Sequence, residues 1–164
     1  MESSPKNDLA EIASQLLNNN QWAALATVSV KHDGFPFASQ APYSVIQRQQ
    51  DQPVPTNQSK QAHQMGIPIF LFSDLSVHSK NLRKNAKATL LIQAGGDMQQ
   101  SRVSLMGVVQ RIRDDAVDQA RRSYLAHHPQ AVQWASFGDF HFYSMSIVDC
   151  YVVAGFGEAG WVKQ

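Results

Sequence analysis

The chain has 164 residues, of which 43% are hydrophobic and 16% charged, a balance typical of a folded domain rather than a disordered chain. Fourteen basic and thirteen acidic residues give a formal net charge of +1, which excludes the global positive field of a nucleic-acid-binding protein. The single cysteine, Cys150, excludes an internal disulfide, and no apolar run is long enough for a membrane span or a signal peptide. We therefore expect one cytoplasmic domain over residues 1–164, without nucleic-acid or membrane partners.

The N-terminal part of the chain predicts a helix followed by a β-hairpin. Apolar residues recur at helical spacing over Asp8–Asn19, and Asp8 is a suitable N-cap residue. Trp22–Val30 and Phe35–Val45 are rich in small and β-branched residues, and an Asp33-Gly34 turn signal separates them. We expect these two runs to pair as antiparallel strands.

Two prolines and a glutamine-rich segment distinguish the second strand and the residues after it. Pro36 and Pro42 cannot donate ladder hydrogen bonds, which favours an edge strand, a bulge, or backbone turned toward a ligand. Ile46–Gly66 contains seven glutamines and almost no large apolar side chain. This composition predicts a flexible loop, either disordered or serving as a lid.

The second half of the chain predicts strands with one long helix. Four runs have β character, and these are Pro68–Ser73, Ala88–Ala94, Arg102–Ile112 and Phe140–Asp149. The first run is nearly all apolar, which predicts burial on both faces, and Gly107 marks a β-bulge in the third. Asp114–His127 predicts an amphipathic helix that Pro129 stops. The order indicates a mainly β fold, an antiparallel barrel with peripheral helices.

The polar segment after Pro68–Ser73 has the composition of an anion site. It offers side-chain donors at Ser73, His78, Ser79, Lys80 and Asn81, and first-turn helix amides would add positive charge. The alternative is a solvated surface turn, for which such residues are also common.

Two further residues could contact a cofactor. Arg102 could bind a phosphate or the carbonyl edge of a flavin, or form a salt bridge at the barrel rim. Trp161 lies among glycines and could stack on a ring or anchor the C-terminus in a core.

Other nucleotide, metal and nucleophile signals are missing from the sequence. It contains neither a phosphate-loop motif nor a Gly-x-Gly-x-x-Gly motif that opens a helix. His127 and His128 diverge on their helix and cannot easily share a metal, although single histidines remain candidate haem ligands. Cys150 lacks a cationic activator, so we expect a structural role, and no catalytic residue can be named.

An ordered set of short motifs resembles the pyridoxamine 5′-phosphate oxidase-like FMN-binding split barrels, and among them the haem-utilisation branch. The motifs are Gly34-x-Pro36, Ser39-x-x-Pro42-Tyr43, Phe72-Ser73-Asp74-Leu75, His78-Ser79-Lys80-Asn81-Leu82, Asn85-Ala86-Lys87-Ala88, Arg102-Val103-Ser104-Leu105-Met106-Gly107 and Gly155-Phe156-Gly157-Glu158-Ala159-Gly160-Trp161. The resemblance covers nearly the whole chain. We expect this chain to lack the further C-terminal domain that is common in that branch.

The resemblance implies a six-stranded antiparallel split barrel that forms a homodimer with FMN at its interface. It places the residues Ser39, Ala41, Pro42 and Tyr43 along the isoalloxazine edge. It assigns the FMN phosphate to Ser73 and the turn His78–Asn81, with Arg102 near the flavin and Trp161 near the partner's cofactor.

Three functions follow as expectations. The first is a flavin-dependent oxidoreductase, in which FMN supplies the redox chemistry and the protein supplies orientation. The second is haem binding or oxidative haem breakdown. The third is a non-catalytic dimeric cofactor-binding module, since a fold does not by itself imply a function.

Overall fold

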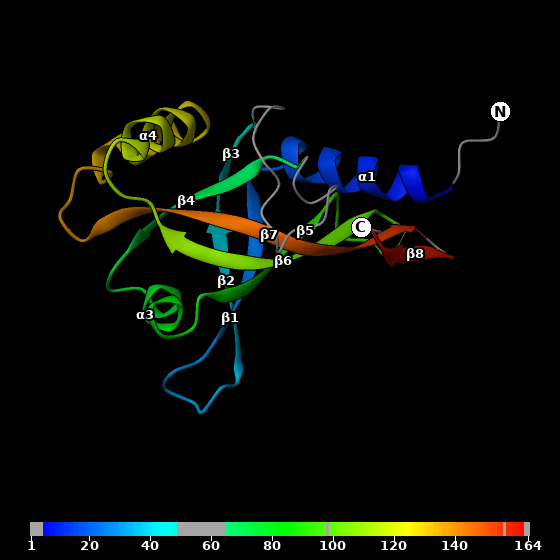
Figure 1. The fold of residues 1–164 in the computed structure, drawn as a ribbon, viewed down its shortest axis with the longest axis horizontal. Coiled ribbons are helices and arrows are strands. Elements are labelled where there is room, and N and C mark those ends of the chain that lie inside the picture. The colour runs from blue at the N-terminus through cyan, green and yellow to red at the C-terminus, as the bar shows by residue number, and fades with distance from the viewer. Residues whose placement is uncertain (1–4, 49–64, 98, 156, 163–164) are drawn as a thin grey trace.

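Eight β-strands form one antiparallel sheet in the described part of the chain (Figure 1). The computed structural model describes residues 5–48, 65–97, 99–155 and 157–162, so most of the predicted loop Ile46–Gly66 lies outside the described residues. The strands are β1 (Trp22–Val28), β2 (Pro36–Pro42), β3 (Ser44–Ile46), β4 (Ile67–Ser73), β5 (Lys87–Gln93), β6 (Arg102–Arg111), β7 (Phe140–Gly155) and β8 (Glu158–Trp161). Hydrogen-bonded neighbours follow the order β2-β1-β5-β6-β7-β4-β3, and β8 pairs with β7. Apart from the short β3 and β8, the strands number six, as predicted.

The helices lie around this sheet. They are α1 (Pro5–Asn19), α3 (Val77–Lys84), α4 (Ala116–His127) and the 3₁₀-helix η1 (Pro129–Gln133). The predicted N-cap at Asp8 is wrong, because α1 already begins at Pro5, and proline suits a first helical position where no amide partner is needed. Among the described helices, none combines the length and apolarity needed to cross a membrane.

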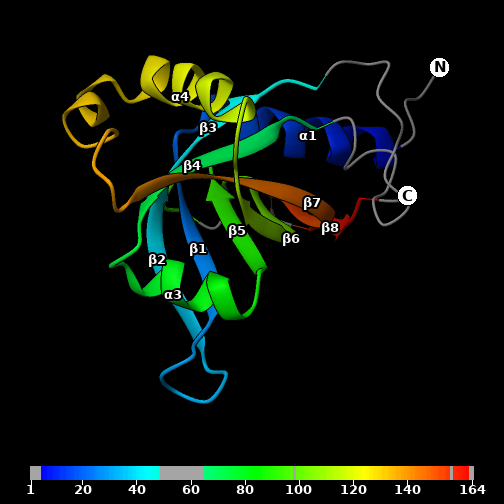
Figure 2. The same ribbon diagram turned by 60° about the vertical axis from the view of Figure 1, so that its left-hand side comes forward.

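The sheet curls until its two ends meet at Tyr43. β2 and β3 follow one another in the chain, yet they occupy opposite ends of the strand order, and Figure 2 shows the resulting curvature. The predicted strand Phe35–Val45 is therefore two strands, interrupted at Tyr43 where the chain crosses from one sheet edge to the other. The half-barrel closes around this residue.

Tyr43 is fully buried and forms three hydrogen bonds at this crossing. Its amide donates to the Gln21 carbonyl at 2.9 Å, and its carbonyl accepts from His128 Nε2 at 2.9 Å. Its hydroxyl donates to the Leu17 carbonyl at 2.9 Å. Leu17 lies in the last turn of α1, where carbonyls lack helical partners, so Tyr43 also caps this helix.

Two apolar cores lie on opposite sides of β4. Phe70 and Phe72 face the barrel interior, where their rings stack with centroids 5.1 Å apart. Ile69 and Leu71 face α4 and pack in a second cluster with Tyr124. The predicted burial of this strand on both faces is confirmed, because the barrel covers one face and α4 the other.

Three local predictions about the backbone are confirmed. The β6–β7 register shifts between Met106 and Gly107, and a side chain at Gly107 would collide with the Ser146 carbonyl. Asp33 and Gly34 both have positive φ, at 43° and 80°, in the turn between β1 and β2. β2 contains Pro36 and Pro42, which have no amide hydrogen to donate, and it lies at one end of the strand order, as predicted for an edge strand.

Replacing Tyr43 with phenylalanine should lower the free energy of unfolding by about 1–2 kcal/mol, since the Leu17 carbonyl loses its donor while the ring packing is kept. Urea denaturation would measure the change. Tyr151→Phe is the matched control, because the Tyr151 hydroxyl has no such bond among the described residues, and its effect should stay within about 0.5 kcal/mol. Equal losses in the two variants would contradict the capping role.

Candidate cofactor site

The predicted phosphate turn is the beginning of helix α3. Ser76 caps the helix, and its hydroxyl oxygen accepts from the Ser79 amide at 3.3 Å. The same hydroxyl donates to Ser79 Oγ at 2.7 Å, and Ser79 is fully buried. The Ser79 side chain therefore faces its own helix cap rather than an external ligand.

Asn81 fixes α3 to the first strand of the barrel. Its Oδ1 accepts from the Val30 amide at 3.0 Å, and its Nδ2 donates to Thr27 Oγ1 at 3.0 Å. Asn81 is 2% exposed and Thr27 3%. Both ends of this amide are used inside the protein.

His78 joins α3 to β2. Its Nδ1 lies 3.1 Å from Ser39 Oγ, and its ring lies 4.3 Å from that of Phe72. Burial lowers the pKa of His78, so the imidazole is neutral at physiological pH. Ser73 is similarly committed, since its hydroxyl donates to Asp139 Oδ2 at 2.6 Å. Of the side chains predicted to hold the phosphate, Lys80 is the one that is exposed.

The other predicted residues lie apart from α3. Ala41 and Tyr43 are fully buried, and Pro42 lies between them at the barrel closure. Arg102 on β6 pairs with Gln93 on β5. Lys87 begins β5 next to α3, and Gln93 lies six residues further along, so Arg102 is about 20 Å from the end of the strand that adjoins the helix. Within one chain, the structure does not bring Arg102 to the helix.

Trp161 lies on the same outer face of the sheet as Arg102. It is 53% exposed on β8, and its ring meets that of Tyr151 edge-on at 5.2 Å. It does not anchor the C-terminus in the core, because the residue buried there is Val162. Its exposed ring is available to a cofactor or a second chain.

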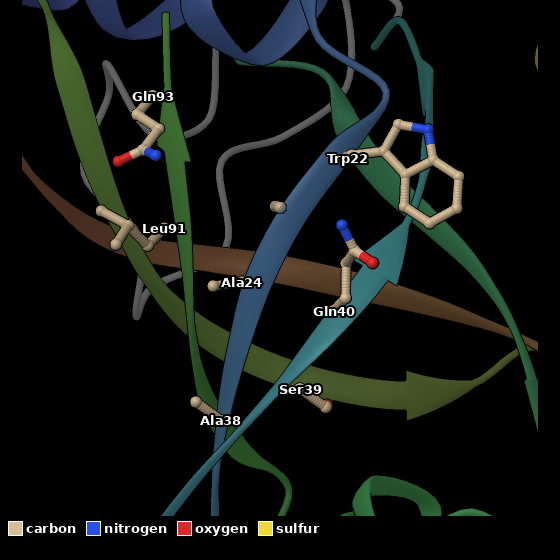
Figure 3. Close-up of a pocket in the computed structure, with 8 residues that line it drawn as sticks. Trp22, Ala24, Ala38, Ser39, Gln40, Leu91 and Gln93 are labelled. Atoms are coloured by element: carbon tan, nitrogen blue, oxygen red, sulfur yellow. The ribbon is translucent and has the colours of Figure 1, made fainter. Parts of the chain in front are cut away.

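A depression of about 470 Å³ opens on the outer face of β1, β2 and β5 (Figure 3). Ala24 and Ala38 form its floor, with Trp22 and Gln40 on one side and Leu91 and Gln93 on the other. Ser39 also borders it, so this residue connects the depression with His78. A flat apolar floor with amide groups at its margin suits a planar ring.

A second depression of about 430 Å³ adjoins the first along the same strands. Ala26 and Thr89 continue its floor, two residues along β1 and β5 from Ala24 and Leu91. Met106 from β6 borders it and is 36% exposed, and Lys87 is the cation at its margin. The two depressions follow one another along β1, β2 and β5, and we call them together the outer groove.

Sequence reasoning missed most of the outer groove. The signal was present in β1, where Leu25 and Thr27 are buried while Trp22, Ala24 and Ala26 face outward. An outward row of apolar and small residues is unusual for a solvated sheet face. Burial and the neighbouring Asp149 raise the pKa of the Cys150 thiol to about 12, which favours the structural role expected for this residue.

Asn81→Ala should lower the free energy of unfolding by about 2–4 kcal/mol, since it leaves the Val30 amide and the Thr27 hydroxyl without partners in a buried site. Chemical denaturation would measure this loss. Lys80→Ala, one residue away and exposed, should change stability by less than about 0.5 kcal/mol. If Asn81→Ala is as stable as the wild type, the predicted role of Asn81 in binding a ligand is favoured again.

Acid should destabilise the protein partly through His78. Its folded pKa is lowered by burial, so below the ordinary value of 6.5 the unfolded chain binds a proton that the folded chain resists. Stability is therefore complete above that pH and falls as the pH drops toward the lowered folded value. His78→Phe should show a smaller loss of stability between pH 7 and 5, measured by thermal unfolding. His32→Phe, at an exposed position, should keep the wild-type pH dependence.

Solved structures share this fold at low sequence identity. A haem-binding protein from Mycobacterium smegmatis superposes with a TM-score of 0.76 at 22% identity, covering 99% of this chain and 59% of that one. A Clostridium acetobutylicum protein of the pyridoxinephosphate oxidase family superposes with a TM-score of 0.65 at 11% identity, covering 96% and 95%. The predicted split-barrel fold is thereby confirmed.

Sequence comparison gives a relative and a family. The chloroplastic haem oxygenase HOZ of Arabidopsis thaliana is 31% identical over 128 residues, which are 77% of this chain and 34% of that protein. The chain thus spans about a third of this relative's length. The family described as CREG, beta-barrel matches residues 4–164. The chain therefore belongs to the CREG β-barrel family, whose barrel is the split-barrel fold described above.

Proposed function

We propose that this protein binds haem in the outer groove. The observation that carries the proposal is the wide apolar floor across neighbouring strands, built from Ala24, Ala26 and Ala38 and left exposed. Strands about 4.8 Å apart give a face several strands wide, on which a planar macrocycle can lie flat. The two depressions together fall within the usual volume range of a ligand site.

The side chains around the groove suit the parts of a haem molecule. The alanine floor and Leu91 would contact the ring, and the Lys87 ammonium would pair with a propionate. Met106 supplies a thioether, which is a known type of haem-iron ligand. None of the described histidines borders the groove, so an imidazole ligand would come from elsewhere. When bound, haem supplies iron-centred redox chemistry, while these residues hold and orient it.

Two similar proteins support haem as a ligand. The Arabidopsis relative is named as a haem oxygenase, and the Mycobacterium smegmatis structure as a haem-binding protein. Because the chain spans only part of each of these proteins, we carry over haem binding first and haem breakdown as a further step of the same proposal.

We also propose that the protein is a homodimer whose interface includes the outer groove. Trp22 and Trp161 are about half exposed, and Leu91 and Met106 are more than a third exposed on the same sheet face. Their burial against a second copy would remove apolar surface from water and enclose the cofactor between two chains.

FMN is the second candidate, because two amide side chains border the alanine floor. Gln40 and Gln93 could hydrogen-bond the polar edge of a flavin, with Arg102 opposite Gln93 on the next strand. The phosphate is the less suited part of this ligand, since Ser79 and Asn81 already have internal partners. An FMN phosphate would therefore meet Lys87, or Lys80 as the exposed member of the predicted cluster. A flavin-dependent oxidoreductase activity depends on this second candidate.

Titration of the purified protein with hemin should produce a saturable Soret band. Leu91→Glu should weaken binding about tenfold or more, because a carboxylate would be buried against the ring. Val132→Glu is the control, since Val132 is an exposed apolar residue on η1, away from the groove, and hemin affinity should stay unchanged. Sedimentation of the same variants would test the homodimer.

A parallel FMN titration separates the two candidates. If FMN binds saturably, Leu91→Glu loses this binding, and hemin gives no Soret band, then flavin replaces haem as the proposed ligand. If Leu91→Glu binds both hemin and FMN as tightly as the wild type does, the outer groove is not the binding site.

A further inference from the structure

A basic cleft lies between α3 and the C-terminal end of β6, at a different place from the outer groove. Its volume is about 510 Å³, and it is lined by Asp74, Arg83, Gln110, Arg111, Arg113 and Tyr143. In Figure 1 the arrowhead of β6 lies at the left of the view, above α3. No residue of this cleft borders the two depressions of the outer groove.

The cleft holds three guanidinium groups against one carboxylate. That carboxylate, Asp74, is already engaged, since its Oδ1 lies 3.1 Å from Arg83 Nη1 and its Oδ2 lies 3.0 Å from His141 Nε2. Arg111 and Arg113 form no ion pair or side-chain hydrogen bond with any described residue. Arg111 at the end of β6 and Arg113, two residues further along the chain, thus present donors that the described part of the protein does not use.

The buried end of the cleft carries a neutral hydroxyl. Tyr143 is 4% exposed and pairs with Arg111 across the β6–β7 ladder. Burial is the main cause that raises the pKa of Tyr143, Asp74 raises it further, and Arg111 and Arg83 oppose the shift. A side-chain hydrogen bond with Ser79 also opposes the rise in this pKa. Because burial is the largest effect, the phenol keeps its proton and can donate a hydrogen bond.

Guanidinium groups and a phenol that converge on one hollow suit an oxyanion. Arginine binds phosphate and carboxylate groups with two parallel hydrogen bonds, and such bonds to charged groups are stronger than those between neutral partners. We propose that this cleft is a second binding site, in which Arg83, Arg111, Arg113 and the Tyr143 hydroxyl hold a multiply charged oxyanion, either a phosphate or a polycarboxylate group of a small molecule.

Amide chemical shifts of the isotopically labelled full chain would test this site, with inorganic phosphate, pyrophosphate and citrate as probes at low ionic strength. We expect saturable shifts at Arg111, Arg113 and Tyr143. Arg111→Gln and Arg113→Gln should each raise the dissociation constant about fivefold or more, and the double variant by more than about tenfold. The relative affinities of pyrophosphate and citrate would assign the group to phosphate or carboxylate.

Arg122→Gln is the matched control, because Arg122 is exposed on α4 and does not border the cleft, and it should change the dissociation constant less than twofold. Tyr143→Phe tests the hydroxyl, with thermal unfolding showing that the barrel remains folded. Hemin affinity should be unchanged in Arg111→Gln, which separates this site from the outer groove. Absence of saturable shifts with all three probes, or equal losses in Arg122→Gln and Arg111→Gln, would overturn the proposal.

Discussion

The half-barrel depends on the place where the chain crosses from one sheet edge to the other. Tyr43 satisfies its own backbone there through Gln21 and His128, and its hydroxyl caps the end of α1. These bonds are buried, where an unpaired amide or carbonyl is unfavourable by roughly 1–3 kcal/mol. One residue thus fixes the closure of the sheet, the end of the first helix and the position of the residues after α4.

Closure divides the sheet into two faces with different properties. The inner face is filled by apolar residues from α1 and the strands, and α3 covers one end through Asn81 and His78. The outer face of β1, β2, β5 and β6 remains exposed and carries the alanine floor. Because a side chain on a strand faces either inward or outward, a ligand for this barrel must bind outside or at an end.

The polar residues of α3 illustrate how one composition can serve two purposes. Serine, histidine and asparagine after a buried strand can hold an anion, and the same groups can satisfy each other and the barrel backbone. The burial of Ser79 and Asn81 decides between these roles in favour of internal bonding. Arg111 and Arg113 of the basic cleft form no ion pair with a described residue, so they are better placed to meet an external anion.

Local sequence determined most of the secondary structure. The alternation in Phe140–Asp149, the all-apolar run before Ser73, and the Asp33-Gly34 turn each depend on neighbouring residues. Each element formed at its predicted place, although β7 continues beyond Asp149 to Gly155. The ordered motifs also indicated the split barrel, and the family match agrees with them. The helix start at Pro5 was missed, because Asp8 is an equally acceptable local signal.

Only the tertiary structure decided which side chains meet. The break at Tyr43 depends on the strand order, which pairs residues far apart in sequence. Ser39 meets His78, and Asn81 meets Thr27, across separations of 39 and 54 residues. The resemblance implies that Arg102 and α3 contact one cofactor, and the register of β5 with β6 shows that within one chain they lie at opposite ends of a strand. Residue types and periodicity determined the elements, whereas the site depends on register and curvature, which no single segment encodes.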